Sequence, residues 1–117
     1  MSIDNVLASV AVKDLNVARA WYSRLLGSDG SSPMPEVVEW SFDGGGSLQV
    51  YQLAERAGHG SCTLAVHDID TEVRKLKAMG VDTSQRSSSD RVKTVMVTDP
   101  DGNHIALAEA LDASLAK

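Results

Sequence analysis

The spacing of hydrophobic side chains changes several times along the chain, and each change marks a predicted element. Residues 6–12 alternate between two faces, which is typical of a strand. In residues 15–26 the large hydrophobic side chains recur at every third or fourth position, so this stretch is predicted to be an amphipathic helix. Asn16 is the expected N-cap of this helix, and Gly27 is its expected C-cap.

Polar and glycine-rich stretches separate the next predicted elements. Residues 28–35 are rich in serine, glycine and proline, which indicates a loop. Strands are expected over 37–42 and 47–53, and the turn at 43–46 between them predicts a hairpin. A short linker over 54–60 then ends the first half of the chain.

The same order of elements begins again after this linker. Residues 64–70 (LAVHDID) match residues 10–16 (VAVKDLN) position by position, at an offset of 54 residues. A second helix is predicted to follow, with Asp70 in the N-cap role that the first helix gives to its asparagine, and with Gly80 beyond its end. An internal repeat of this kind constrains the fold more than any single element does.

The second half ends in a hairpin. A short strand at 81–85 and a polar turn at 86–90 are expected first. Strands at 93–97 and from Ile105 onward then flank a turn at 99–102, whose proline and glycine suit its second and fourth positions. Each half therefore reads strand, helix, then two or three strands.

We predict a single α+β domain over residues 1–117 that contains two βαβββ modules in a pseudo-twofold repeat. The first module spans about residues 3–53 and the second about 61–110. Two sheets, each with one helix on its outer side, leave a concave inner face that needs a ligand, a metal or a partner.

Composition excludes several classes of function. The net charge of −5 and the lack of a Lys/Arg cluster argue against a nucleic-acid partner. Cys62 is the sole cysteine, so an internal disulfide and a cysteine-rich zinc site are excluded. No apolar run approaches the roughly 20 residues that cross a bilayer. No secretory signal pattern opens the chain, so we expect a cytoplasmic protein without membrane contact.

Six stretches of the repeat, taken together, resemble the vicinal oxygen chelate superfamily, which includes glyoxalase I, extradiol dioxygenases and bleomycin-resistance proteins. The matching stretches are residues 10–16, 20–22, 25–27, 66–70, 78–81 and 98–103. The resemblance covers residues 3 to 110 and implies paired βαβββ modules that form a cleft. It also implies a homodimer.

The resemblance further implies where a metal would bind. Metal-dependent members take His, Glu or Gln ligands from the first and last strand of each module. The corresponding positions here are Leu7, Gln49, Ser61 and Ala106. A divalent metal of this class needs about three or more N or O donors. One amide and one hydroxyl opposite leucine and alanine do not supply them, so we expect neither a metal nor another cofactor.

A metal site displaced by one pleat is an alternative. His59 and His104 each lie two residues before one of the expected ligand positions, so each could share the face of its strand with that position. Such a site would combine them with Gln49. The competing interpretation places His104 beside a turn and His59 in an exposed linker.

Alternation along the strands predicts a mostly apolar cleft with a few hydrogen-bonding groups, which suits a small-molecule ligand. Trp40 could equally face a helix, and Glu36 and Glu39 near the mouth either favour a cationic ligand or are solvated surface charge. We expect a metal-free binding protein similar to the bleomycin-resistance branch. The alternative is a metal-dependent lyase or isomerase of the glyoxalase I type, and whether any reaction is catalysed stays open. The expected ligand-binding residues are Leu7, Ser9, Trp40, Gln49, Tyr51, His104 and Ala106.

Overall fold

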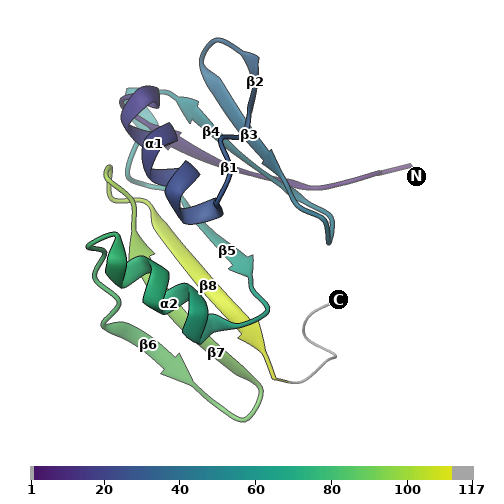
Figure 1. The fold of residues 1–117 in the computed structure, drawn as a ribbon. Helices are drawn as coiled ribbons and strands as arrows, with labels where there is room; N and C mark the ends of the chain where they lie inside the picture. Colours follow the sequence, from purple (N-terminus) through teal and green to yellow (C-terminus); the bar gives the residue numbers. More distant parts are fainter. Residues whose placement is uncertain (1, 112–117) are drawn as a thin grey trace. The chain divides into compact units, whose positions relative to one another are not determined.

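A computed structural model describes residues 2–111 of the chain, which divides into two compact units (Figure 1). The first unit runs to Gly60 and also includes Pro100–Asn103. The second unit consists of Ser61–Asp99 and the residues from His104 onward. Each unit contains one four-stranded sheet and one α-helix, so the predicted α+β fold with two βαβββ modules is confirmed.

The sheet of the first unit has the strand order β1-β4-β3-β2. β1 runs parallel to β4, and the other neighbours are antiparallel. A short 3₁₀ turn, η1, follows the last strand. The elements in chain order are β1 (Leu7–Val12), α1 (Leu15–Leu26), β2 (Ser31–Met34), β3 (Val37–Ser41), β4 (Ser47–Gln52) and η1 (Ala54–Arg56).

The second unit repeats this topology with the order β5-β8-β7-β6, again with one parallel pair, β5 and β8. Figure 1 shows α2 lying across one face of its sheet, with β6 at the outer edge. The elements are β5 (Ser61–Ala65), α2 (Ile69–Ala78), β6 (Gln85–Ser88), β7 (Val92–Thr98) and β8 (His104–Ala110). No helix among residues 2–111 is long and apolar enough to span a membrane.

Each helix buries one apolar stripe against one face of its own sheet, as the alternation along the strands requires. In the first unit the ring of Tyr22 is fully buried, and its centroid lies 6.0 Å from that of Trp40. In the second unit, aliphatic side chains fill the equivalent layer. Its buried members are Ile69, Val73, Leu76, Val95, Val97, Ile105 and Leu107.

The N-cap of each helix lies two residues before the predicted one. The N-caps are Asp14 and Asp68, so the prediction of Asn16 and Asp70 was wrong. Each aspartate is extended, and its carboxylate accepts hydrogen bonds from the amides two and three residues on. The apolar residue after each cap, Leu15 or Ile69, lies inside the first turn. The predicted C-cap Gly27 is confirmed, with φ of 76°.

The edge strands β2 and β6 were not predicted. β2 lies inside the stretch expected to be a loop, and β6 begins where a strand was expected to end. All residues of both strands are exposed. An edge strand with polar side chains on both faces shows no hydrophobic alternation, so the sequence pattern cannot reveal it.

The predicted turn between β7 and β8 is confirmed, and the residue that follows it, Asn103, anchors the first unit. The side chain of Asn103 is fully buried. Its Oδ1 accepts hydrogen bonds from the amides of Gly58 (3.1 Å) and Gly60 (2.9 Å), and its Nδ2 donates to the carbonyl of Ala11 (2.8 Å). A Cβ on Gly58 would lie 2.5 Å from the carbonyl oxygen of Asp101, so only glycine fits at that position. This side chain thus holds the linker and the turn against β1.

Candidate functional site

The face of the first sheet opposite α1 collects most of the predicted binding residues. Strand register places Ser9 beside Gln49, and Gln49 beside Glu39 on the next strand. Leu7 is 43% exposed at the start of β1, and Tyr51 is half-buried near the end of β4. The structure therefore brings Leu7, Ser9, Gln49 and Tyr51 together on one face, as alternation predicted.

A chain of hydrogen bonds crosses this face from β1 to β3. The hydroxyl of Ser9 donates to Oε1 of Gln49 at 3.3 Å. Nε2 of Gln49 donates to Oε2 of Glu39 at 3.2 Å. Both ends of the Gln49 amide are thus engaged by protein groups, and the carboxylate of Glu39 fixes which way the amide points. The result is a pre-oriented polar line in an otherwise mostly apolar surface.

Glu39 has a larger part in this face than the sequence pattern indicated. It carries the one charge on this face among the residues of β1, β3 and β4. Solvated surface charge was one interpretation of it, but the side chain is half-buried and bonded to Gln49. The signal was available, because Glu39 lies between Val37 and Ser41 in the alternation and pairs with Gln49 across the hairpin.

Trp40 does not share this face, which corrects its place among the predicted ligand-binding residues. It lies on the side of the sheet that α1 covers and is 3% exposed. Its indole N–H donates to the carbonyl of Ser28 at 2.9 Å. Side chains alternate between the two faces along β3. Because Glu39 faces away from the helix, its neighbour Trp40 must face toward it.

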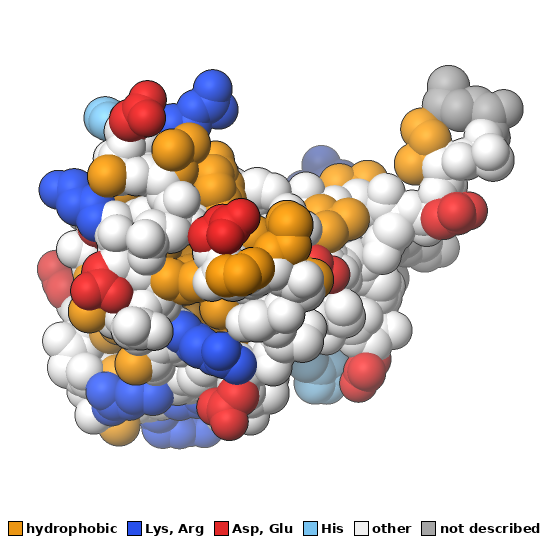
Figure 2. Space-filling model, turned by 90° about the horizontal axis from the view of Figure 1, so that it is seen from above, with side chains coloured by type: hydrophobic (Ala, Val, Ile, Leu, Met, Phe, Trp, Pro, Cys, Tyr) orange, Lys and Arg blue, Asp and Glu red, His pale blue; other side chains and the backbone are white. Residues whose placement is uncertain are grey.

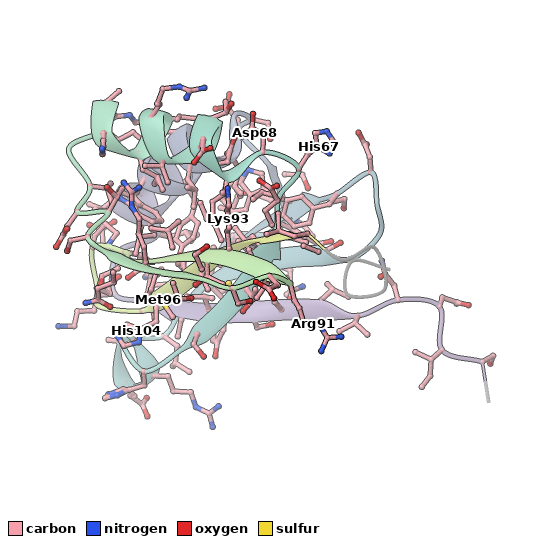
Figure 3. All side chains as sticks on the ribbon, turned by 90° about the horizontal axis from the view of Figure 1, so that it is seen from below. His67, Asp68, Arg91, Lys93, Met96 and His104 are labelled. Atoms are coloured by element: carbon pink, nitrogen blue, oxygen red, sulfur yellow. The ribbon has the colours of Figure 1, made fainter. Side chains whose placement is uncertain are left out.

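The face of the second sheet opposite α2 carries the two remaining predicted residues. His104 is paired with Ser61 and Thr98, and Ala106 with Thr63 and Met96. Figure 3 shows Met96 and His104 on the side of this sheet away from α2. Small and hydroxyl side chains dominate here, so this surface offers room and weak hydrogen bonds rather than charge.

The residues at the four ligand positions do not fit a divalent metal. The side chains of Leu7 and Ala106 have no atom that could ligate a metal, and the amide oxygen of Gln49 already accepts a hydrogen bond from Ser9. Ser61 adds only a hydroxyl. Within residues 2–111, no three His, Cys, Asp or Glu side chains are grouped so that they could hold a metal ion.

The displaced alternative also loses its geometric basis. His59 lies in no strand, because η1 ends at Arg56 and β5 begins at Ser61. Alternation therefore does not place its exposed side chain on a sheet face. His104 does lie in a strand, and Gln49 is committed to its two neighbours in the first unit.

The one thiol is unsuited to nucleophilic chemistry. Cys62 lies on the helix side of β5, and burial, followed by the negative charge of Asp99, raises the pKa of its thiol. A raised pKa keeps the sulfur protonated at neutral pH, and the thiolate is the nucleophilic form. Cys62 is therefore a packing residue.

Comparisons with known proteins agree with this geometry. Residues 7–108 match the family model described as a glyoxalase-like domain. The structure of a glyoxalase/bleomycin resistance protein from Catenulispora acidiphila is 34% identical with a TM-score of 0.80, and the match covers 90% of this chain and 96% of that one. TnmS3, an antibiotic binding protein from Streptomyces sp. CB03234, is 26% identical with a TM-score of 0.81, and the match covers 94% and 98%.

A lactoylglutathione lyase from Agrobacterium tumefaciens is 16% identical with a TM-score of 0.76, covering 93% of this chain and 95% of that one, and so shares the fold alone. A search of curated protein sequences finds no match. The family match spans most of the chain and agrees with the observed pair of βαβββ modules. The chain therefore belongs to the family of glyoxalase-like domains, within the vicinal oxygen chelate superfamily.

Proposed function

We propose that this protein is a cytoplasmic binding protein that holds a small organic molecule on the face of the first sheet opposite α1, without a metal ion. The observation that carries the proposal is the hydrogen-bonded line from Ser9 through Gln49 to Glu39. A few fixed polar groups within an apolar surface are the usual make-up of a small-molecule site.

The charge on this face supports a ligand that carries a positive group. Glu39 keeps one carboxylate oxygen that is not used by Gln49. Tyr51 supplies an aromatic face two residues along β4 from Gln49. A carboxylate and an aromatic ring together suit a cationic, partly planar molecule, by ion pairing and cation–π contact.

The family and two of its structures are consistent with binding rather than with a defined reaction. One similar structure is named a glyoxalase/bleomycin resistance protein, and another an antibiotic binding protein. Neither name fixes the ligand of this chain. The unsuitable donor set at the four metal positions weakens the lyase alternative further.

Calorimetric titration with bleomycin and with the planar cation proflavine tests this proposal. We expect at least one probe to bind, and Glu39→Gln to weaken its binding about tenfold, because one charge-assisted contact is lost. Glu36→Gln removes the same charge from an exposed loop and serves as the matched control. Binding that is equally weakened by both variants, or no binding of either probe, would contradict the proposal.

Metal content is tested separately. Protein purified without a histidine tag is expected to contain no stoichiometric metal, and titration with Zn²⁺, Ni²⁺ and Mn²⁺ is expected to leave its melting temperature unchanged. One equivalent of metal that is lost in Gln49→Ala would instead favour the lyase or isomerase alternative.

We also propose that the protein forms a homodimer. β1 is an edge strand, and apolar side chains stand exposed at and before its start, at Ile3 (69%), Val6 (74%) and Leu7 (43%). Figure 2 shows this N-terminal segment reaching out with hydrophobic side chains on its surface. Light scattering coupled to gel filtration should give twice the mass of one chain, and Val6→Asp should shift the mass toward that of one chain.

A further inference from the structure

The second unit contains a groove that no element of the proposed binding face contributes to. It lies between the start of α2 and the strands β6 and β7, and its volume is about 270 Å³. Three buried side chains, Ile69, Val73 and Val95, form an apolar floor. Asp70, Arg86 and Lys93 stand around it.

The first unit shows why this space is open. At the repeat offset of 54, Val73 takes the place of Arg19, and Arg86 takes the place of Ser32. In the first unit Arg19 reaches from α1 to the edge of the sheet, where it donates to the carbonyl of Asp29 and to the hydroxyl of Ser32, both at 3.3 Å. The long side chain therefore bridges the space that the short Val73 leaves empty.

The arginine of the second unit does not replace that bridge. Arg86 turns back along the chain, where its Nε donates to the carbonyl of Thr83 at 2.8 Å and its Nη2 to the hydroxyl of the same residue at 3.3 Å. These bonds leave its Nη1 without a hydrogen bond to any residue that the structure describes. The guanidinium of Arg86 is thus held beside the groove, and its Nη1 can donate to a ligand.

Lys93 places a second cation at the same groove. Figure 3 shows its side chain rising from β7 on the side of α2. Among residues 2–111 its ammonium has no hydrogen bond or ion pair. Glu109 is its cross-strand neighbour, but one oxygen of that carboxylate accepts from the amide of Ile69 at 2.8 Å. Asp70 is the acidic group of the groove itself, on the helix side.

We propose that this groove binds a small organic carboxylate with a compact apolar body. The apolar part would cover Ile69, Val73 and Val95, and the carboxylate would meet Lys93 and Arg86 on the strand side. Burial of aliphatic surface and two charge-assisted contacts favour such a molecule over a simple anion, which would leave the floor exposed. This site is separate from the proposed binding face of the first sheet, and the proposal does not depend on the proposed function.

Titration of the ¹⁵N-labelled full-length protein with 3-methylbutanoate tests this proposal by amide chemical shifts. We expect saturable shifts at Asp70, Val73 and Thr94, with a Kd of roughly millimolar for so small a ligand. The isosteric 3-methylbutanamide and 3-methylbutylamine should bind at least about tenfold more weakly, because they lack the negative charge.

Variants separate the groove from general effects. Lys93→Met nearly keeps the length of the side chain and should weaken binding about tenfold or more, whereas Lys77→Met, at an exposed position on α2, should not. Val73→Arg restores the residue of the first unit and should abolish binding. Should the arginine variant fail to fold, as judged by circular dichroism, Lys93→Met alone decides.

Three results would overturn the proposal. The first is the absence of any saturable shift up to about 50 mM 3-methylbutanoate, far above the expected Kd. The second is equally tight binding of the neutral amide. The third is an equal loss of affinity in Lys93→Met and Lys77→Met. Shifts confined to Ser9 and Gln49 would place the carboxylate on the other unit and would equally overturn it.

Discussion

The two units share a topology but differ in what fills equivalent positions. The first packs Tyr22 and Trp40 between helix and sheet, where the second has Leu76 and Val97. On the opposite face the first has the line that ends at Glu39, and the second has mainly small side chains. Equivalent backbones therefore carry different chemistry.

This difference shows which features define the fold and which define a site. Both helices are capped by an aspartate and receive a second bond from the last strand of their sheet. The amide of Leu15 donates to Gln52 at 3.0 Å, and that of Ile69 donates to Glu109 at 2.8 Å. These repeated contacts hold the helix on its sheet in both units. The two proposed sites, by contrast, depend on positions that differ between the units, such as Glu39 and Val73.

The largest expected effect concerns the hydrogen bonds of Asn103, which have no counterpart at the equivalent turn of the first module. Gly46 takes the position of Asn103 in the first module, at an offset of 57. Asn103→Ala should lower the free energy of unfolding by about 3 kcal/mol or more, because two amides and a carbonyl lose their partner in a buried place. Urea unfolding followed by circular dichroism measures this. A loss below about 1 kcal/mol, or one as small as that of the exposed Asn16→Ala, would show that water replaces the side chain.

The next effect sharpens the contrast between the two cores. Trp40→Val installs the residue of the second module, Val97, which occupies the equivalent place in the strand pairing at an offset of 57. It should cost about 2–4 kcal/mol, from the lost apolar contacts and the lost bond to Ser28. Trp21→Val, at a half-exposed position on α1, should cost clearly less. Equal losses in urea unfolding would mean that the aromatic layer is not the main support of the first core.

The sequence predicted the strands and helices that bury one face. β1, α1, β3, β4, α2, β7 and β8 all follow a hydrophobic period, and the internal repeat placed them in order. β2 and β6 could not be found this way, because their side chains are exposed on both faces. The caps were misplaced by two residues because both aspartate and the following polar residue suit the role, and only the backbone shows which one is extended.

The sequence predicted those parts of the site that follow from the alternation of side chains along a strand. Alternation alone predicts the sheet face on which Ser9, Gln49 and Tyr51 lie. The face of Trp40 could be assigned only from the pairing of β3 with β4. The bond between Glu39 and Gln49 and the bridge from Arg19 depend on rotamers and on contacts between strands. Neither is encoded in local spacing, so the pattern alone could not distinguish them from solvated charge.

A smaller effect tests the repeated caps. Asp14→Ala should cost about 1 kcal/mol in urea unfolding, and Asp68→Ala should also lower the stability, because in each variant two amides of the first turn lose their acceptor. Asn16→Ala should change stability by less than about 0.5 kcal/mol, because its side chain is exposed and outside the cap. A larger loss in Asn16→Ala than in Asp14→Ala would return the capping role to the asparagine.

The smallest effect depends on pH and on the charge of one cap. The hydroxyl of Thr71 donates to Asp68 at 2.9 Å, and this bond, followed by those from the amides of the first turn, lowers the pKa of Asp68 below its usual value. A folded-state pKa below the unfolded value, about 3.9, means that the ionised carboxylate stabilises the fold above that pH. The contribution is then lost as the pH falls through the folded-state pKa.

Asp68→Asn isolates this contribution, because asparagine also caps helices but does not ionise in this range. The wild type should be the more stable of the two in urea unfolding at pH 7, and the gap should narrow as the pH falls below about 4. A gap that stays constant down to about pH 2 would show that geometry rather than charge sets the strength of the cap. The second helix would then be held at its start by the same neutral hydrogen bonds that any Asx cap supplies.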